Sequence, residues 1–324
     1  EALAGYGDKR MIYEIGTTGM LFTPKIQTII TAKIGNDKEF ADAESSDHFE
    51  QEKGIRSKVN SVFGNVSGDT PPLDNERFIT PQDKLISANS IQKLSKESTF
   101  RTNINYAFSK SSYEYGTESR YYTGGNELVI NEDITPLSKI HKPILEMEYK
   151  LNKDKRFMDD KLTFAANFIE KDFYTIDSGQ PLEQNKTAKI IDMKNNFDWR
   201  LKTGSQYWNV SSLVQYTATP KCDFNISEKN GTKYQSGHSG SLYTEELINT
   251  IYEFSHSRLY LPFTVKFTYD DLETNLQKDG NSYANQLYGT NFNPVFYPRY
   301  EYNTPDNRFI FRIGVTGKGY IFNV

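Results

Sequence analysis

Residues 143–151 read PILEMEYKL, and this stretch decides the fold. Its apolar side chains occupy alternate positions: Leu145, Met147, Tyr149 and Leu151. Charged side chains occupy the positions between them: Glu146, Glu148 and Lys150. A repeat of two residues is that of a β-strand, and the core of a sandwich would not accept three charges from one strand. The stretch predicts a strand with lipid on one face and water or polar groups on the other.

The same alternation returns along the chain, in strands of the length that a membrane requires. Its apolar members are Phe100, Ile104, Tyr106 and Phe108; Leu162, Phe164, Ala166 and Phe168; Ile191, Met193, Phe197, Trp199 and Leu201; and Leu259, Leu261, Phe263, Val265, Phe267 and Tyr269. A tilted barrel strand spans a bilayer with about 9–11 residues. Counting from QTIITAKIGND gives roughly eleven strands, half of the 22 found in large plugged barrels. The expected fold is therefore an all-β, antiparallel transmembrane β-barrel that is incomplete here.

The expected connections alternate between short and long. Short connections fall at 94–97, 152–156, 203–204, 257–258 and 303–306, and long polar ones at 109–140, 177–187, 223–240 and 277–289. Bacterial barrels have this asymmetry, with tight periplasmic turns and long extracellular loops. The stretch 38–83 is polar and punctuated by Pro and Gly, which predicts a long loop or excursion.

Composition agrees with a barrel and excludes several other classes. Aromatic residues make up 14% of the chain, yet the mean hydropathy is −0.67, too polar for a globular core of this size. No apolar run is long enough for a membrane helix. The single cysteine, Cys222, excludes an internal disulfide, and a net charge of −4 without a basic stripe excludes nucleic acid as a partner. Without a signal peptide pattern at EALAGYGDKRM, and with a strand at its other end, the chain is expected to be a fragment.

The order of several stretches resembles a known family. They are QTIITAKIGND, then PPLDNERFITPQDKLISANSIQKLSKESTFRTNINYAF, then PILEMEYKLNKDKRFMDDKLTFAANF, and finally NPVFYPRYEYNTPDNRFIFRIGV. Together they are similar to the front half of the barrel in TonB-dependent outer-membrane receptors, in the branch whose members carry a carboxypeptidase-regulatory-like domain before the plug. The resemblance covers nearly the whole chain and does not indicate a substrate.

This resemblance implies a function that the chain would share with its missing parts. Residues 1–26 resemble the end of a plug domain and the passage into the first strand, and 27–324 the front half of the barrel with long extracellular loops. The implied protein is a receptor of the bacterial outer membrane that imports a nutrient. Its implied partners are membrane lipid, its own plug and TonB, which would bind a missing N-terminal segment. Some relatives also bind a surface lipoprotein.

Catalytic, metal and cofactor sites are not expected. The four histidines are His48, His141, His238 and His256, and none lies at metal-ligand spacing from another or beside the cysteine. SGHSGSLYTEE around His238 holds Ser, His and acidic groups, but this composition is common in polar loops. GVTGKGY lacks the spacing of a phosphate-binding loop. We expect the protein not to be an enzyme, and the charges on the inward face to contact a plug or water: Glu146, Glu148, Asp192, Lys194, Asp198 and Arg200.

One aromatic segment is a candidate for ligand contact. KSSYEYGTESRYYTGGNE carries Tyr113, Tyr115, Tyr121 and Tyr122, and tyrosine combines a stacking face with a hydroxyl group. The alternative is an aromatic belt that anchors the strand ends at the membrane interface.

Two other functions are compatible with the sequence. A passive porin or a surface-adhesion barrel would need neither a plug nor TonB. A soluble β-sandwich binding module would pack its apolar faces against each other. The direction in which the apolar side chains point separates the sandwich from the two barrel hypotheses.

Overall fold

A computed structural model describes residues 2–7, 10–37, 39–41, 63–66, 70–123, 126–177, 180–229, 231–304, 310–319 and 321–323. In these residues 17 strands form one antiparallel sheet. The strands are β1 (Ala2–Gly7), β2 (Arg10–Phe22), β3 (Ile26–Gly35), β4 (Thr80–Lys93), β5 (Ser98–Ser112), β6 (Tyr115–Thr123), β7 (Asn126–Lys153), β8 (Arg156–Asp177), β9 (Gln180–Thr203), β10 (Gln206–Glu228), β11 (Gly231–Glu253), β12 (Ser257–Lys278), β13 (Asn281–Phe296), β14 (Arg299–Asn303), β15 (Ile310–Gly314), β16 (Gly317–Lys318) and β17 (Ile321–Asn323). A short helix, α2 (Asn75–Phe78), lies in the connection between β3 and β4.

Several short strands continue one another, so the sheet has fewer positions than strands. β6 follows β5 along the same partner, β7, and β14 follows β13 along β12. β15, β16 and β17 together form the last position, beside β14 and β13. From β3 onward this leaves eleven positions in the described chain, as the alternation predicts.

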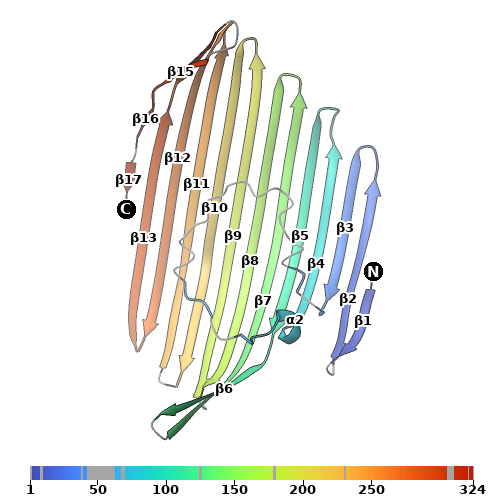
Figure 1. The fold of residues 1–324 in the computed structure, drawn as a ribbon, viewed down its shortest axis with the longest axis vertical. Helices are drawn as coiled ribbons and strands as arrows, with labels where there is room; N and C mark the ends of the chain where they lie inside the picture. The colour runs from blue at the N-terminus through green and yellow to red at the C-terminus, as the bar shows by residue number, and fades with distance from the viewer. Residues whose placement is uncertain are drawn as a thin grey trace.

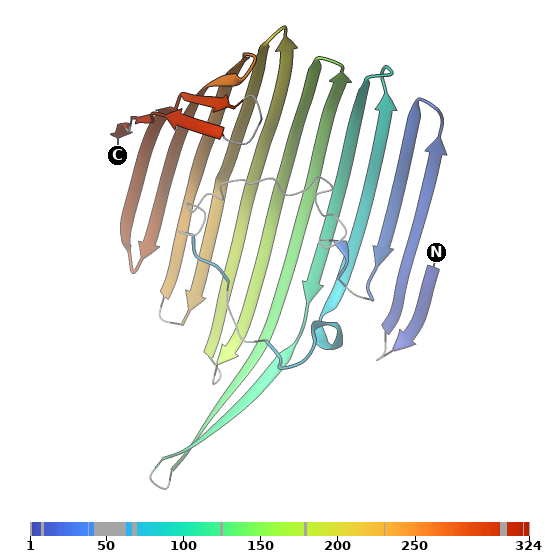
Figure 2. The same cartoon turned by 45° about the horizontal axis from the view of Figure 1, so that its top comes forward.

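The sheet is a single curved layer that does not close on itself (Figures 1 and 2). β1 and β2 stand at one edge and β15 to β17 at the other (Figure 1). The predicted fold class, an antiparallel barrel wall that is incomplete here, is confirmed. Residues 2–7 and 10–22 are strands that extend the sheet, with β2 paired to β3. The division of the chain at residue 26 into plug and barrel is untested and stays a prediction.

Cross-strand register aligns the predicted apolar residues in transverse rows. One row runs through seven strands as successive partners: Ile104, Leu145, Phe164, Met193, Tyr216, Leu242 and Tyr269. A second row, six residues nearer the short turns, contains Leu151, Met158, Trp199, Val210, Ile248 and Phe263. These side chains share one side of the sheet, which we call the outer face. The single layer has no second sheet against which they could pack.

The opposite side, the inner face, is polar and in part deeply buried. Asn103, Glu146, Thr163 and Lys194 are successive partners in a row of this face. The Glu146 side chain has no exposed area and accepts a hydrogen bond from the Asn103 amide. The prediction that the charges of PILEMEYKL share one face is therefore confirmed, and a buried partner explains how a carboxylate is tolerated there.

The expected long loops differ from the structure. Residues 180–187, 223–228, 231–240 and 281–289 belong to strands β9, β10, β11 and β13. β12 and β13 are joined by a tight turn in which Asp279 and Gly280 have positive φ. These segments are rich in polar residues, which is why the sequence favours loops there. The hairpin of β6 and the start of β7 extends farthest and projects beyond the sheet (Figure 2).

A bulge in β10 changes which side chains face inward. Between Ala218 and Lys221 the register to β9 shifts by one residue, and the register to β11 shifts between Thr219 and Cys222. Pro220 lies inside the bulge and has no N–H to donate to the ladder. Beyond it, Lys221 faces outward and Cys222 faces inward.

Candidate functional site

Part of the connection between β3 and β4 is fixed to the inner face near β4 and β5. The backbone N–H groups of Phe40 and Ala41 donate to Asp83 Oδ2 over 2.7 and 2.8 Å. The Ser109 hydroxyl donates to the other carboxylate oxygen over 2.7 Å. Phe40 and Ala41 also pack with Leu85 and Ala107, which are buried. The fully buried Asp83 thus has three donors, and we call this group the first anchor.

A second anchor of the same connection lies across the sheet, on β9 to β12. Phe63 packs with the buried side chains of Ala188, Cys222 and Leu272. The next residue, Gly64, donates its N–H to Gln235 Oε1 over 2.8 Å. The connection is therefore held at two places that are several strands apart.

Glycine is required where the second anchor meets the sheet. A Cβ on Gly237 would lie 2.3 Å from the Glu273 carbonyl oxygen and 2.8 Å from the Phe63 ring. A Cβ on Gly64 would lie 2.3 Å from the Phe224 ring. Only residues without a side chain allow this approach of the two backbones.

A cavity of about 450 Å³ lies next to the first anchor, over β4, β5 and β7. Its lining side chains are mainly hydroxyl and charged groups: Glu39, Asp83, Ala107, Ser109, Ser111, Ser138, Ile140 and Lys142. Ser111 and Ser138 are direct cross-strand partners in its floor. The volume suits a small molecule with several hydrogen-bonding groups.

A second cavity, of about 210 Å³, adjoins the first at Ser111 and Ser138. Its lining is more apolar: Val66, Ile79, Tyr113, Pro136, Leu137 and Phe173, with Lys171 and Asp172. The edge of one ring meets the face of the other at Tyr113 and Phe78 of α2, with centroids 5.1 Å apart. The two cavities together offer a polar and an apolar compartment.

Charges near the short turns form a network on the inner face. Glu148 is nearly buried and lies 2.8 Å from Lys150 Nζ, 3.8 Å from Arg101 and 3.9 Å from Lys161. Lys150 also lies 3.4 Å from Asp159. Three cations around one carboxylate offset the cost of removing it from water. Glu148 thus has protein partners within the sheet, in addition to the plug or water that the sequence predicts for it.

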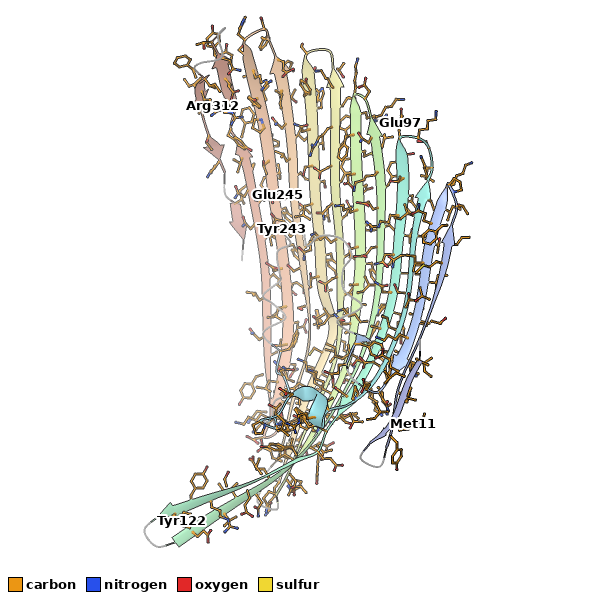
Figure 3. All side chains as sticks on the ribbon, turned by 45° about the vertical axis from the view of Figure 1, so that its right-hand side comes forward. Met11, Glu97, Tyr122, Tyr243, Glu245 and Arg312 are labelled. Carbon is orange, nitrogen blue, oxygen red and sulfur yellow. The ribbon has the colours of Figure 1, made fainter. Side chains whose placement is uncertain are left out.

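The structure places the four predicted tyrosines in two different surroundings. Tyr113 lines the second cavity. Tyr115, Tyr121 and Tyr122 belong to β6, on the projecting hairpin, where the last two are 53% and 75% exposed. Figure 3 shows Tyr122 at the far tip and Glu97 at the opposite end of the sheet. The four residues therefore do not form one pocket, and ligand contact by them stays a prediction.

The projecting hairpin has its own charge pairs. Arg120 donates to Glu118 over 2.5 Å and to Glu127 over 3.2 Å. This hydrogen bond to Glu118 raises the pKa of Arg120 above its ordinary value. The Arg120–Glu127 pair joins the two strands of the hairpin, and both exposed pairs contribute little to stability.

Metal-ligand clusters and membrane-length helices are absent from the part of the chain that the structure describes. It holds no group of three or more His, Cys, Asp or Glu side chains positioned for a metal ion. Among the same residues, no helix has the length and apolarity to cross a membrane. His48 lies outside the described residues. His238 Nε2 lies 4.0 Å from Glu273 and is half exposed. The prediction that the protein is not an enzyme is untested and stays a prediction.

Sequence reasoning did not identify the two anchors or the serine-lined cavity. Asp83 and Ser109 occupy inward positions of their strands, as any solvated polar residue would. Gly237 gave the one available signal, because an isolated glycine within a strand indicates close approach of another backbone.

No family model matches the chain, and no curated protein matches its sequence. Among solved structures, the ferric-catecholate import receptor Fiu from E. coli K12, in its open form, has a TM-score of 0.30 and 7% identity. That match covers 96% of this chain and 67% of the other.

The lone cysteine can report whether Phe63 stays on the sheet. Cys222 is 2% exposed beneath the second anchor. Replacing a packed Phe with Ala costs about 3–5 kcal/mol, and each 1.4 kcal/mol is about a factor of ten. We expect Phe63→Ala to raise the rate of maleimide labelling of Cys222 at least about tenfold, measured by mass shift on the detergent-solubilised full-length protein. Phe78→Ala, at the second cavity, is the control and should leave the rate unchanged. Equal labelling in all three proteins would contradict the second anchor.

A pair of glycines in β11 tests the close approach itself. Gly237→Ala places a methyl group against backbone atoms, and overpacking of this kind costs about 1–3 kcal/mol. Gly240→Ala, in the same strand, is the matched control, because its Cβ would meet only the Asp271 side chain, at 3.9 Å. We expect the first variant alone to lower the denaturant midpoint of unfolding. Equal midpoints would contradict the close packing of β11 against Phe63 and the β12 backbone.

Proposed function

We propose that the chain forms part of the wall of a bacterial outer-membrane barrel that acts as a TonB-dependent receptor and imports a nutrient. In this proposal the outer face contacts membrane lipid. The inner face lines the lumen together with the plug, and TonB drives transport through the missing N-terminal part. A surface lipoprotein is a further proposed partner. Transport requires no covalent chemistry by the residues described here.

The observation that carries the proposal is an outer face that is mostly apolar, with Asp160 and Glu246, each hydrogen-bonded to a neighbouring strand, as charged exceptions. The row from Ile104 to Tyr269 crosses seven strands without a charged residue. Several of its side chains are exposed, among them Ile104 and Met193. An exposed apolar row of this extent is unfavourable in water and favourable in lipid. The two anchored parts of the connection support a lumen that is partly filled from within.

Substitution on the two faces of β8 tests membrane insertion. Phe164 points outward in the apolar row, whereas Asn167 is on the inner face of the same strand. An Arg on the lipid face costs about 2–4 kcal/mol at the membrane centre. We therefore expect Phe164→Arg to abolish assembly of the full-length protein into the outer-membrane fraction, measured by resistance to carbonate extraction. Asn167→Arg should assemble normally. Normal assembly of both variants, or extraction of the wild type, would contradict a membrane wall.

The same preparation separates the receptor from a passive pore. The receptor hypothesis expects the full-length protein to bind purified TonB in detergent, and a porin or adhesion barrel would not. If the full-length protein assembles in the membrane but does not bind TonB, the receptor hypothesis is wrong and the pore or adhesion function remains.

A further inference from the structure

The apolar outer face ends, on the side of the projecting hairpin, in a row that mixes basic and aromatic residues. Its members are cross-strand partners in order: Lys84, Phe108, His141, Phe168, Lys189 and Lys221. The row nearer the sheet centre is apolar up to β10: Ile86, Tyr106, Pro143, Ala166, Ile191 and Ala218. On β4 to β10, basic side chains therefore begin one row beyond this apolar row. We call the mixed row the basic row.

Two lysines of the basic row face each other directly. Lys189 of β9 is the partner of Lys221 of β10, and both side chains are exposed. Residues directly opposite have Cβ atoms about 4.5–5.5 Å apart, where like charges are destabilising. Lys221 Nζ lies 2.8 Å from Asp223. For Lys189 the described residues provide no ion-pair partner. An anion between the two ammonium groups would remove the repulsion.

The other end of the basic row is built around Phe108. Lys84 Nζ lies 5.6 Å from the centre of its ring, and the His141 ring lies 4.7 Å from it on the next strand. The Tyr106 hydroxyl is 2.7 Å from His141 Nδ1. Aromatic and basic side chains together are typical of the level of lipid headgroups.

Acidic groups are fewer at this level. Glu170 lies 3.4 Å from Lys139 in the next row toward the projecting hairpin, and Asp223 pairs with Lys221. Against them stand Lys84, Lys110, Lys139, Lys189 and Lys221 on the same face. From β4 to β10 the outer face therefore carries more basic than acidic groups beside the apolar band, and on β12 the same face carries Asp271 and Glu273.

We propose that the basic row binds the phosphate groups of a membrane lipid, with Lys189 and Lys221 holding one phosphate between them. The proposal rests on the proposed function, because it needs the outer face to be in a membrane. The acyl chains would then lie on Ile191 and Ala218, directly beneath the two lysines. A lipid satisfies both the charge and the adjoining apolar surface, whereas free phosphate satisfies only the charge.

The experiment compares two pairs of basic residues that both lie on the outer face of the sheet. Lys153 and Arg156 are also directly opposite on the outer face, but at the short-turn end of the sheet. Lys153 is 61% exposed in its side chain and Lys221 64%, and each is within reach of one carboxylate. The test variant is Lys189→Gln/Lys221→Gln, and the matched control is Lys153→Gln/Arg156→Gln. Both use the full-length protein in detergent.

The measurement is the dissociation constant for lipid A by native mass spectrometry, with phosphatase-treated lipid A and inorganic phosphate as further probes. Each basic residue near an anionic surface contributes roughly 1 kcal/mol, so the test variant should bind lipid A about tenfold more weakly or worse. The control variant should bind like the wild type, and phosphatase-treated lipid should not distinguish the three proteins.

Three results would overturn the proposal. They are equal affinity of the test variant and the wild type, an equal loss in the control variant, and binding of inorganic phosphate as tight as that of lipid A. Carbonate extraction of the same proteins decides separately whether the barrel function itself has failed.

Discussion

The cross-strand register from β4 to β12 is the constraint on which the rest of the structure depends. Successive side chains in a strand alternate between faces, so a slip of one residue would move a whole strand's apolar set to the polar side. A row such as Ile104, Leu145 and Phe164 exists only because each hairpin keeps its register. In a single layer, neither face can pack against a second sheet. Outer and inner surroundings must therefore differ in kind, as lipid and polar lumen do.

The inner face adds a second constraint, because polar groups there are buried by contacts within the chain. Asp83 has three donors, two from the connection and one from Ser109. Glu148 has three cations around it. Removing one partner of such a group is more costly than the net gain that the whole group provides. The connection and the wall thus stabilise each other, and the two cavities lie beside described parts of the connection, at Glu39 and Val66.

The sequence predicts features that depend on periodicity and not those that depend on contact between distant segments. The faces of Leu145 and Glu146, the strand count from residue 27 and the antiparallel class follow from alternation. The strand at 180–187 was expected to be a loop, because a strand solvated on both faces has no apolar period. Contact between Phe63 and Ala188 depends on a connection that is far away in sequence, and nothing local to either residue indicates it. Tyr113 was identified by its type, but its separation from Tyr122 follows from the length of one hairpin.

The bulge at Pro220 connects the two faces. Without the extra residue, β10 would continue with Cys222 and Phe224 outward and Lys221 inward. With it, Cys222 lies beneath Phe63 and Phe224 lies against Gly64, while Lys221 comes opposite Lys189. Because a proline cannot donate to the ladder, the shift costs little at this position. One irregularity therefore produces both the second anchor inside and the paired lysines outside. For the same reason, a change that removed the bulge would be expected to disturb the lumen and the lipid-facing surface together.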